Sequence, residues 1–231
     1  MIFFEHQIYL FVFLLPAILL GVFAQYRVRS TYAEASRIGA RMSGYAAART
    51  ILDAAGLHAV DVQQTSGHLD DHYSPREKLL RLSPEVFHGA TLAAVGIAAH
   101  EAGHALQDAK RYAPLIVRNA AVPAAGLGDK IGGLLMVLGV IFSWPMLLLA
   151  GIAIFSAVLF FQVVNLPVEF DASARAKRQL VELGVVDQSE MPFVRRVLSA
   201  AALTYVAATM QTALTLLFYL LRFAGQSRDD S

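Results

Sequence analysis

The chain has 231 residues, of which 56% are hydrophobic and 16% are charged, and its mean hydropathy is +0.52. This composition is too apolar for an ordinary soluble domain, so we expect several membrane-spanning helices. The chain contains no cysteine, which excludes disulfides and thiolate zinc sites. Its net charge of +1 provides no broad basic surface, and we therefore expect no nucleic-acid partner.

The first apolar run extends from Ile2 to Ala24 and is long enough to cross a bilayer. A cleaved signal peptide is the alternative. However, no Lys or Arg precedes the run, and Glu5 stands where a signal peptide carries positive charge. We therefore predict an uncleaved transmembrane helix within residues 1–24.

Residues 25–121 are predicted to form the first part of a domain outside the membrane. A polar segment with helical spacing ends at Gly56, and strand-like pieces follow it. Turn signals at Ser66-Gly67 and Ser74-Pro75 separate these pieces. We interpret them as a small antiparallel sheet with strands at residues 58–64, 69–73 and 78–82.

A helix is predicted after this sheet, from about Gly89 to Lys110. Before it, Ser83 followed by Pro84 is typical of a helix N-cap with proline at the first helical position. The segment from Thr91 onward is rich in small apolar residues, so we expect the helix to be buried.

This helix contains the sequence His100-Glu101-Ala-Gly-His104. Residues i and i+4 of a helix are neighbours on one face, and two neutral imidazoles placed there can bind one Zn²⁺. Glu101 then lies where it can accept a proton from a water molecule that the metal activates. The alternative is a helix with two ordinary histidines, but buried His and Glu side chains need polar partners, and a metal is one such partner.

Four further histidines lie in the segment before this helix. We interpret each as a surface or hydrogen-bonded residue rather than a ligand, although each could bind a metal. They are His58, His68, His72 and His88. The strand Lys78–Leu82 is the candidate for an exposed edge that binds an extended peptide by strand addition.

Residues 122–164 are apolar almost throughout, with interruptions at Asp129-Lys130 and Ser143-Trp144-Pro145. This length is too great for one crossing, which takes about 20 residues. We predict a transmembrane hairpin with helices at about 123–142 and 146–164. Asp129 and Lys130 are expected to mark the start of the first helix or to pair with polar groups inside the bundle.

A hydrolytic zinc site has three protein ligands, so a third ligand is expected outside the HExxH sequence. Glu169 and Asp171 are the candidates, because they begin a predicted helix within residues 165–196 that carries small residues suited to tight packing. The alternative is that both are ordinary acidic residues at a helix N-terminus. A last membrane helix is predicted over residues 197–221, followed by a disordered tail, residues 222–231.

The placement of charge predicts how the chain crosses the membrane. His100 and Glu169 can share a metal only if an even number of crossings separates them, which the hairpin provides. Of the 19 Lys and Arg residues, 11 lie in residues 25–121 and 5 in residues 165–196. Positive charge stays cytoplasmic. We therefore expect a multi-pass protein of the inner cell membrane, with its active site at the cytoplasmic surface and both termini outside.

Five motifs together carry a resemblance to one family, and they extend over nearly the whole chain. They are Asp71-His-Tyr-Ser-Pro-Arg76, Arg81-Leu-Ser-Pro84, Ala98-Ala-His-Glu-Ala-Gly-His-Ala-Leu-Gln107, Asn165-Leu-Pro-Val-Glu-Phe-Asp-Ala-Ser173 and Ala200-Ala-Ala-Leu-Thr-Tyr-Val-Ala207. This set resembles the YugP-type neutral zinc metallopeptidases of bacterial membranes. More distantly, it is similar to the HtpX-type membrane gluzincins, which pair HExxH with a Glu ligand in a helix patterned Glu-aromatic-x-Ala-Asp.

The resemblance implies a mainly α-helical membrane protein with a zincin-like (gluzincin) domain, a small antiparallel sheet and about four transmembrane helices. It also implies a zinc-dependent endopeptidase that acts on peptides or membrane proteins. The zinc ligands would be His100, His104 and Glu169, with Glu101 as the general base. Ser173 stands where the pattern has Asp, so either Asp171 or Ser173 is expected to orient a ligating histidine.

Two other functions remain open from the sequence. The first is a site-two-type intramembrane protease with Asp171 as the ligand, since Asn165-x-Pro167 before Asp171 is similar to that class's second motif. The second is a non-catalytic zinc-binding membrane scaffold, against which the intact Glu101 argues. Three residues are candidates for the donor to the reacting oxyanion: Tyr205, His72 and Arg195.

Overall fold

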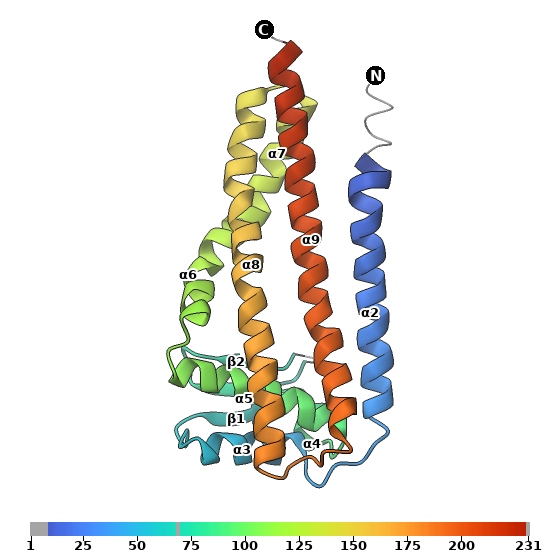
Figure 1. Cartoon of the computed structure of the whole chain (residues 1–231). Helices are drawn as coiled ribbons and strands as arrows, with labels where there is room; N and C mark the ends of the chain where they lie inside the picture. Colours follow the sequence, from blue (N-terminus) through green and yellow to red (C-terminus); the bar gives the residue numbers. More distant parts are fainter. Residues whose placement is uncertain (1–8, 68–69, 230–231) are drawn as a thin grey trace. The chain divides into compact units, whose positions relative to one another are not determined.

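The computed structural model describes residues 9–67 and 70–229 and is mainly helical, as predicted (Figure 1). The chain divides into two compact units. Unit 1 comprises the described parts of residues 1–24, 117–166 and 204–231, and unit 2 comprises those of residues 25–116 and 167–203.

Unit 2 contains a three-stranded sheet with the order β1-β3-β2, formed by β1 (Asp61–Gln64), β2 (His72–Ser74) and β3 (Leu79–Leu82). β3 pairs in parallel with β1 and antiparallel with β2, so the sheet is mixed and the prediction of a wholly antiparallel sheet was wrong. Since β3 is paired on both sides, the segment Lys78–Leu82 offers no free edge, and its prediction as an edge strand was also wrong. Leu69, the predicted start of the second strand, lies outside the described residues.

Three helices surround this sheet in unit 2: α3 (Gly44–Ala54), α4 (Pro84–His88) and α5 (Leu92–Ala109). The predicted N-cap at Ser83 is confirmed, with proline at the first helical position of α4. However, α4 ends at His88, so the predicted helix from Gly89 begins later, as α5.

α5 is the buried centre of unit 2, as its small apolar residues predict. The Thr91 hydroxyl caps its first turn by accepting from the Ala94 N–H at 3.2 Å. α3 packs along α5 (Figure 1). Ala98 and Ala102 of α5 have exposed fractions of 0%, because their short side chains let neighbouring elements approach the helix backbone.

Three helices among the described residues are long and apolar enough to cross a membrane: Ala113–Ile141, Pro145–Glu182 and Met191–Gly225. The first is a continuous helix made of α6 (Ala113–Leu127), the short π-helix η2 (Gly128–Gly132) and α7 (Gly133–Ile141). The second is α8 (Pro145–Glu182), and the third belongs to α9 (Met191–Asp229). The two helices of the predicted hairpin are thus present, and their crossing of the membrane stays a prediction. Asp129 and Lys130 are exposed in the middle of the first of these helices, so their predicted placement at a helix start or inside the bundle was wrong.

The first apolar run is described only from Tyr9 onward. It forms η1 (Tyr9–Leu14) and α2 (Leu15–Ala35), and residues 1–8 lie outside the described part. The fourth crossing therefore stays a prediction.

α8 differs from its prediction in one way that matters for function. The predicted break near Asn165 is absent, because the helix passes through Pro167 without interruption and ends at Glu182. Gly184, with φ of +63°, follows the helix end as predicted. Glu169 and Asp171 therefore lie inside a helix, and the helix-dipole explanation for two acidic residues does not apply to them.

α9 is also longer than its prediction. It begins at Met191 and continues to Asp229. The expectation of a disordered tail from Arg222 is therefore wrong as far as Asp229.

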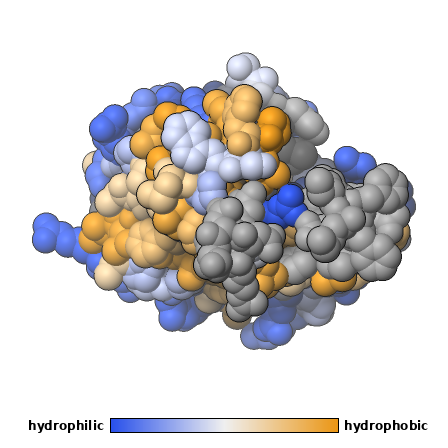
Figure 2. Space-filling view, turned by 90° about the horizontal axis from the view of Figure 1, so that it is seen from above, coloured by the Kyte–Doolittle hydropathy of each residue, from blue (hydrophilic) through white to orange (hydrophobic). Residues whose placement is uncertain are grey.

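Close packing joins the two arms of the hairpin in unit 1. A Cβ atom added at Gly139 would lie 2.5 Å from the Leu148 nitrogen, and one added at Gly132 would lie 2.6 Å from the Phe155 nitrogen. Only glycine permits this approach, which is typical of helix packing in membranes. Outward-facing residues of these helices are mostly large and apolar, and apolar side chains cover much of the surface seen from above (Figure 2).

Candidate active site

The HExxH sequence lies on α5 where this helix meets the unit 2 part of α8. A Cβ atom added at Gly103 would lie 2.5 Å from the Ala172 carbonyl oxygen, so α8 can come this close only to a glycine. Ala172 and Ala176 of α8 are fully buried. The small residues predicted to allow tight packing therefore bring polar groups of the two helices within reach of each other.

Three side chains converge at this contact. The Nε2 atoms of His100 and His104 lie 3.2 Å and 3.7 Å from the same Oε2 atom of Glu169. The side chains are mostly buried, with exposed fractions of 16%, 9% and 7% respectively. One donor atom from each residue lies within 4.8 Å of the other two. Two ligands of a tetrahedral zinc ion lie about 3.4 Å apart, so this arrangement fits that metal.

Gln107 holds the second histidine and was not among the predicted site residues. Its Nε2 donates to the Val168 carbonyl at 2.7 Å and to an Asp171 carboxylate oxygen at 2.9 Å. Because both partners can only accept, the amide orientation is determined, and Oε1 must face His104 Nδ1, which lies 3.0 Å away. His104 therefore donates from Nδ1–H to Gln107, which leaves Nε2 as the nitrogen that can bind a metal.

Ser173 holds the first histidine. Its hydroxyl oxygen lies 3.1 Å from His100 Nδ1. When this oxygen accepts a hydrogen bond from Nδ1–H, the Nε2 lone pair of His100 also faces Glu169. Ser173 thus occupies the position from which the resemblance predicted a residue that orients a histidine.

Asp171 contributes in a different way from Glu169. Its carboxylate accepts from Gln107 and from the Arg175 Nε, which lies one helical turn away on α8. It therefore reaches His104 only through Gln107. Among the described residues, the group that could hold a metal contains Glu169 and not Asp171.

Glu101 follows His100 on α5 and is buried, with an exposed fraction of 8%. Burial raises the pKa of its carboxyl group, the imidazoles of His100 and His104 lower it, and the charges of Glu169 and Asp71 raise it again. The net shift is upward. A raised pKa makes the carboxylate a stronger base, as proton transfer from water requires.

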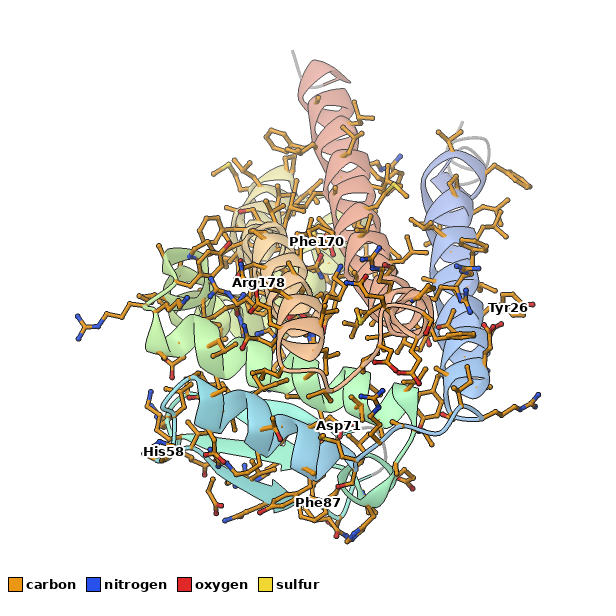
Figure 3. The ribbon with its side chains drawn as sticks, turned by 60° about the horizontal axis from the view of Figure 1, so that its bottom comes forward. Tyr26, His58, Asp71, Phe87, Phe170 and Arg178 are labelled. Atoms are coloured by element: carbon orange, nitrogen blue, oxygen red, sulfur yellow. The ribbon has the colours of Figure 1, made fainter. Side chains whose placement is uncertain are left out.

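Asp71 brings the start of β2 close to Glu101. Its carboxylate accepts from the Ser83 backbone N–H at 2.8 Å and from the Ser83 hydroxyl at 3.1 Å. Burial raises the pKa of Asp71, and its charge acts on Glu101. Figure 3 shows Asp71 beside α5. The edge strand β2 therefore begins near the proposed general base.

The other described histidines lie outside this group. His58 is bonded to Asp53 at the outer edge of unit 2 (Figure 3), and its side chain is 73% exposed. His72 Nδ1 lies 2.9 Å from the Asp70 carbonyl, and His88 Nε2 lies 2.8 Å from a Gln64 oxygen. His68 lies outside the described residues. Of the proposed oxyanion donors, His72 is half-buried and Arg195 is exposed, both in unit 2, and Tyr205 belongs to unit 1.

Residues 10–224 match the sequence model of a family described as "Putative neutral zinc metallopeptidase". The chain belongs to this zinc metallopeptidase family. It is also 43% identical, over 217 residues, to the Bacillus subtilis (strain 168) protein described as "Putative membrane protease YugP", covering 93% of this chain and 95% of that protein. No solved structure matches the chain. The family resemblance inferred from the motifs is confirmed.

Zinc is the metal of this metallopeptidase family, and the donor set suits it. Two imidazole nitrogens and one carboxylate oxygen form the protein ligands of many hydrolytic zinc sites and leave one position open. The three apolar helices and the membrane relative also establish this family member as a membrane protein.

The hydrogen bonds to the two imidazoles predict a measurable effect on zinc binding. Gln107→Met and Ser173→Ala should each weaken zinc affinity about 10- to 100-fold, because each frees one histidine to rotate or change tautomer. Competition against a chelating zinc indicator measures this effect. Gln179→Met and Ser199→Ala, which lie outside the metal group, are the matched controls. Unchanged affinity in both test variants would show that these bonds do not hold the ligands.

Proposed function

We propose that this family member is a zinc-dependent endopeptidase of the cell membrane, with His100, His104 and Glu169 as its zinc ligands. One observation carries the proposal: both Nε2 atoms face a single Glu169 oxygen, while both Nδ1 atoms face oxygen atoms of other side chains. Such hydrogen bonds orient metal-ligating histidines. We further propose that unit 2 is a zincin-like, gluzincin-type domain and that the chain has about four transmembrane helices.

Glu101 is proposed as the general base. Zinc bound at this site would lower the pKa of a coordinated water toward 7 and polarise the scissile carbonyl. Glu101 then accepts the proton of the attacking water and delivers it to the nitrogen of the leaving amine. Its burial keeps competing solvent away from the carboxylate, and its position next to His100 keeps it beside the metal ligands.

Peptides or membrane proteins are the proposed substrates. β2 is one of the two edge strands of the sheet and is attached to α5 by a hydrogen bond from the Tyr73 hydroxyl to Asp108, at 2.7 Å. An extended peptide can add to such an edge through backbone hydrogen bonds. The influence of Asp71 on Glu101 supports this edge, rather than that of β1, as the one near the reacting group.

The proposed location is the inner membrane, with the active site on the cytoplasmic side and with lipid around the helices. The support comes from charge: 16 of the 19 Lys and Arg residues lie in residues 25–121 and 165–196. Basic residues near membrane helices favour the cytoplasmic side.

Two alternatives use the same residues differently. A site-two-type protease would use Asp171 as a ligand, but the bonds of Asp171 to Gln107 and Arg175 disfavour this role. A non-catalytic zinc scaffold would have no use for a buried Glu101, whose desolvation opposes its charged form. The zinc endopeptidase accounts for both residues.

A cleavage assay with controlled zinc content tests the proposal. The full chain, purified in detergent, should cleave members of a fluorogenic peptide library. Removal of zinc with 1,10-phenanthroline should lower the rate at least about 100-fold, and one equivalent of added zinc should restore it, because the metal supplies both water activation and carbonyl polarisation. The non-chelating 1,7-phenanthroline is the matched control. Bound zinc without any cleavage would favour the scaffold, and cleavage that survives loss of zinc would refute the proposal.

A further inference from the structure

A mostly buried cation lies beside the metal group, and the proposed mechanism gives it no role. The side chain of Arg175, on α8, has an exposed fraction of 13%, and its Nε donates to the Asp171 carboxylate at 2.5 Å. Within the described part of the chain, no hydrogen bond or ion pair joins Arg175 directly to a proposed zinc ligand. Removing a charge from water is costly, so its position and its partners call for an explanation.

A single oxygen atom connects Arg175 to the metal group. Oδ2 of Asp171 accepts from Arg175 Nε and, at 2.9 Å, from Gln107 Nε2. The other end of the Gln107 amide, Oε1, lies 3.0 Å from His104 Nδ1. Arg175 therefore fixes the oxygen to which Gln107 donates, and Gln107 in turn orients His104.

Tyr112, just after the end of α5, holds both Arg175 and Gln107. The central guanidinium carbon of Arg175 lies 5.7 Å from the centroid of the Tyr112 ring, a distance at which an aromatic face attracts a cation. The backbone N–H of Tyr112 donates to the Gln107 carbonyl at 3.0 Å. The residue that confines the guanidinium is therefore also bonded to the backbone of Gln107, and the two side chains are held in one arrangement.

We propose that Arg175 is a positioning residue of the zinc site, which acts on His104 through Asp171 and Gln107; this inference rests on the proposed function. An amide that turns over exchanges its oxygen and its nitrogen. Nε2 of Gln107 would then face His104 Nδ1, and a neutral His104 would have to carry its proton on Nε2, the atom that binds the metal. Two acceptors oppose this turn, the Val168 carbonyl and the Asp171 oxygen. Arg175 keeps the second of them in place.

The direction of the expected effect separates positioning from simple electrostatics. The Arg175 cation and a zinc ion repel each other, so loss of the charge alone would raise the zinc affinity. Loss of positioning would lower it. The Asp171 side chain is 30% exposed, and without Arg175 its carboxylate is free to turn toward water and leave Gln107 with one acceptor. A fall in zinc affinity after removal of Arg175 therefore indicates positioning.

Titration of the full chain with zinc, in detergent and against a chelating indicator, tests this role. Arg175→Met should lower the zinc affinity about 5- to 10-fold, at the low end for a residue that supports a ligand, because the Val168 carbonyl still accepts from Gln107. Arg175→Lys should stay within about twofold of the wild type, since Nζ can reach Asp171 over the same i,i+4 spacing. Arg178→Met is the matched control and should not lower the affinity. Arg178 is exposed on the same helix (Figure 3), and its charge acts on Asp171, but it makes no ion pair within the described chain.

A double-mutant cycle tests the path from Arg175 to His104. Gln107→Met breaks this path, so adding Arg175→Met to it should change the zinc affinity by less than about twofold. An Arg175 that only supports the fold would lower the affinity by the same factor in both backgrounds. Additive losses, an unchanged or raised affinity in Arg175→Met, or an equal loss in Arg175→Lys or Arg178→Met would overturn the inference alone. A wild-type chain that binds no zinc would overturn the proposed function as well, so the two failures are distinguishable.

Discussion

Replacing Glu101 by glutamine removes peptide-bond cleavage and leaves zinc bound. Glutamine keeps the size and position of the side chain but cannot accept a proton. General acid–base catalysis contributes about 100- to 10,000-fold, so the cleavage rate should fall by at least about 100-fold. His100, His104 and Glu169 are untouched, and the zinc content should stay at one ion per chain. Metal analysis and a fluorogenic peptide assay on the same preparation measure both quantities.

Glu182→Gln is the matched control for this experiment. Glu182 is an exposed glutamate at the end of α8, bonded only to Gln179 among the contacts that the described chain shows. Its substitution should change neither zinc content nor rate. If Glu101→Gln cleaves as fast as the wild type, another group takes the proton and the proposed mechanism fails. If the variant loses zinc, the loss of activity says nothing about proton transfer, and Glu101 is then a residue that supports the metal.

Substitutions of Glu169 and Asp171 separate the two proposed kinds of protease. Glu169→Ala removes one of three ligands, and zinc affinity should fall by more than about 100-fold. Asp171→Ala removes a support of Gln107, which in turn holds His104, so affinity should fall only about 10- to 100-fold. At saturating zinc, Asp171→Ala should therefore hold one ion, whereas Glu169→Ala should not.

Titration with zinc against a competing chelator gives both affinities, and Glu182→Ala provides an exposed-carboxylate control. The reverse result, with zinc lost from Asp171→Ala and kept by Glu169→Ala, would favour the site-two-type arrangement. Equal and complete loss in both variants would indicate that both carboxylates ligate the metal. Circular dichroism of each variant distinguishes loss of a ligand from loss of the fold.

The sequence predicts the part of the site on α5 better than the part on α8. His100 and His104 are four residues apart on one helix, and local geometry alone places them on one face. Glu169 and Asp171 are two residues apart, so a rotation of about 200° around the axis of α8 separates them. They therefore lie on nearly opposite faces of this helix. Which of them faces the histidines depends on the side of α8 that packs on Gly103, and local sequence does not encode that choice. Gln107 carries a sequence signal, since it is a polar residue three positions after His104 in an apolar helix.

Some features of the fold could likewise be predicted from the sequence, and others depend on tertiary contacts. Short strands could be located from their composition, but β3 became central because it pairs with β1 and β2 at once, and pairing partners are set by tertiary contacts. The hairpin could be predicted because about 40 apolar residues exceed one crossing. The continuation of α8 through Pro167 could not be predicted from the sequence, because proline usually ends or kinks a helix unless its surroundings support the backbone.

The sequence alone predicts a membrane protein with an HExxH helix, two crossings between this helix and the proposed third ligand, and membership of a metallopeptidase family. These properties follow from apolar length, helical spacing and motifs, each of which is local in the chain. The packing of α5 on α8 decides that Glu169 faces the histidines and that Gln107 and Ser173 hold them. Apart from the Gln107–His104 hydrogen bond within α5, these contacts join residues more than 60 positions apart, and close backbone approach at Gly103 brings them together.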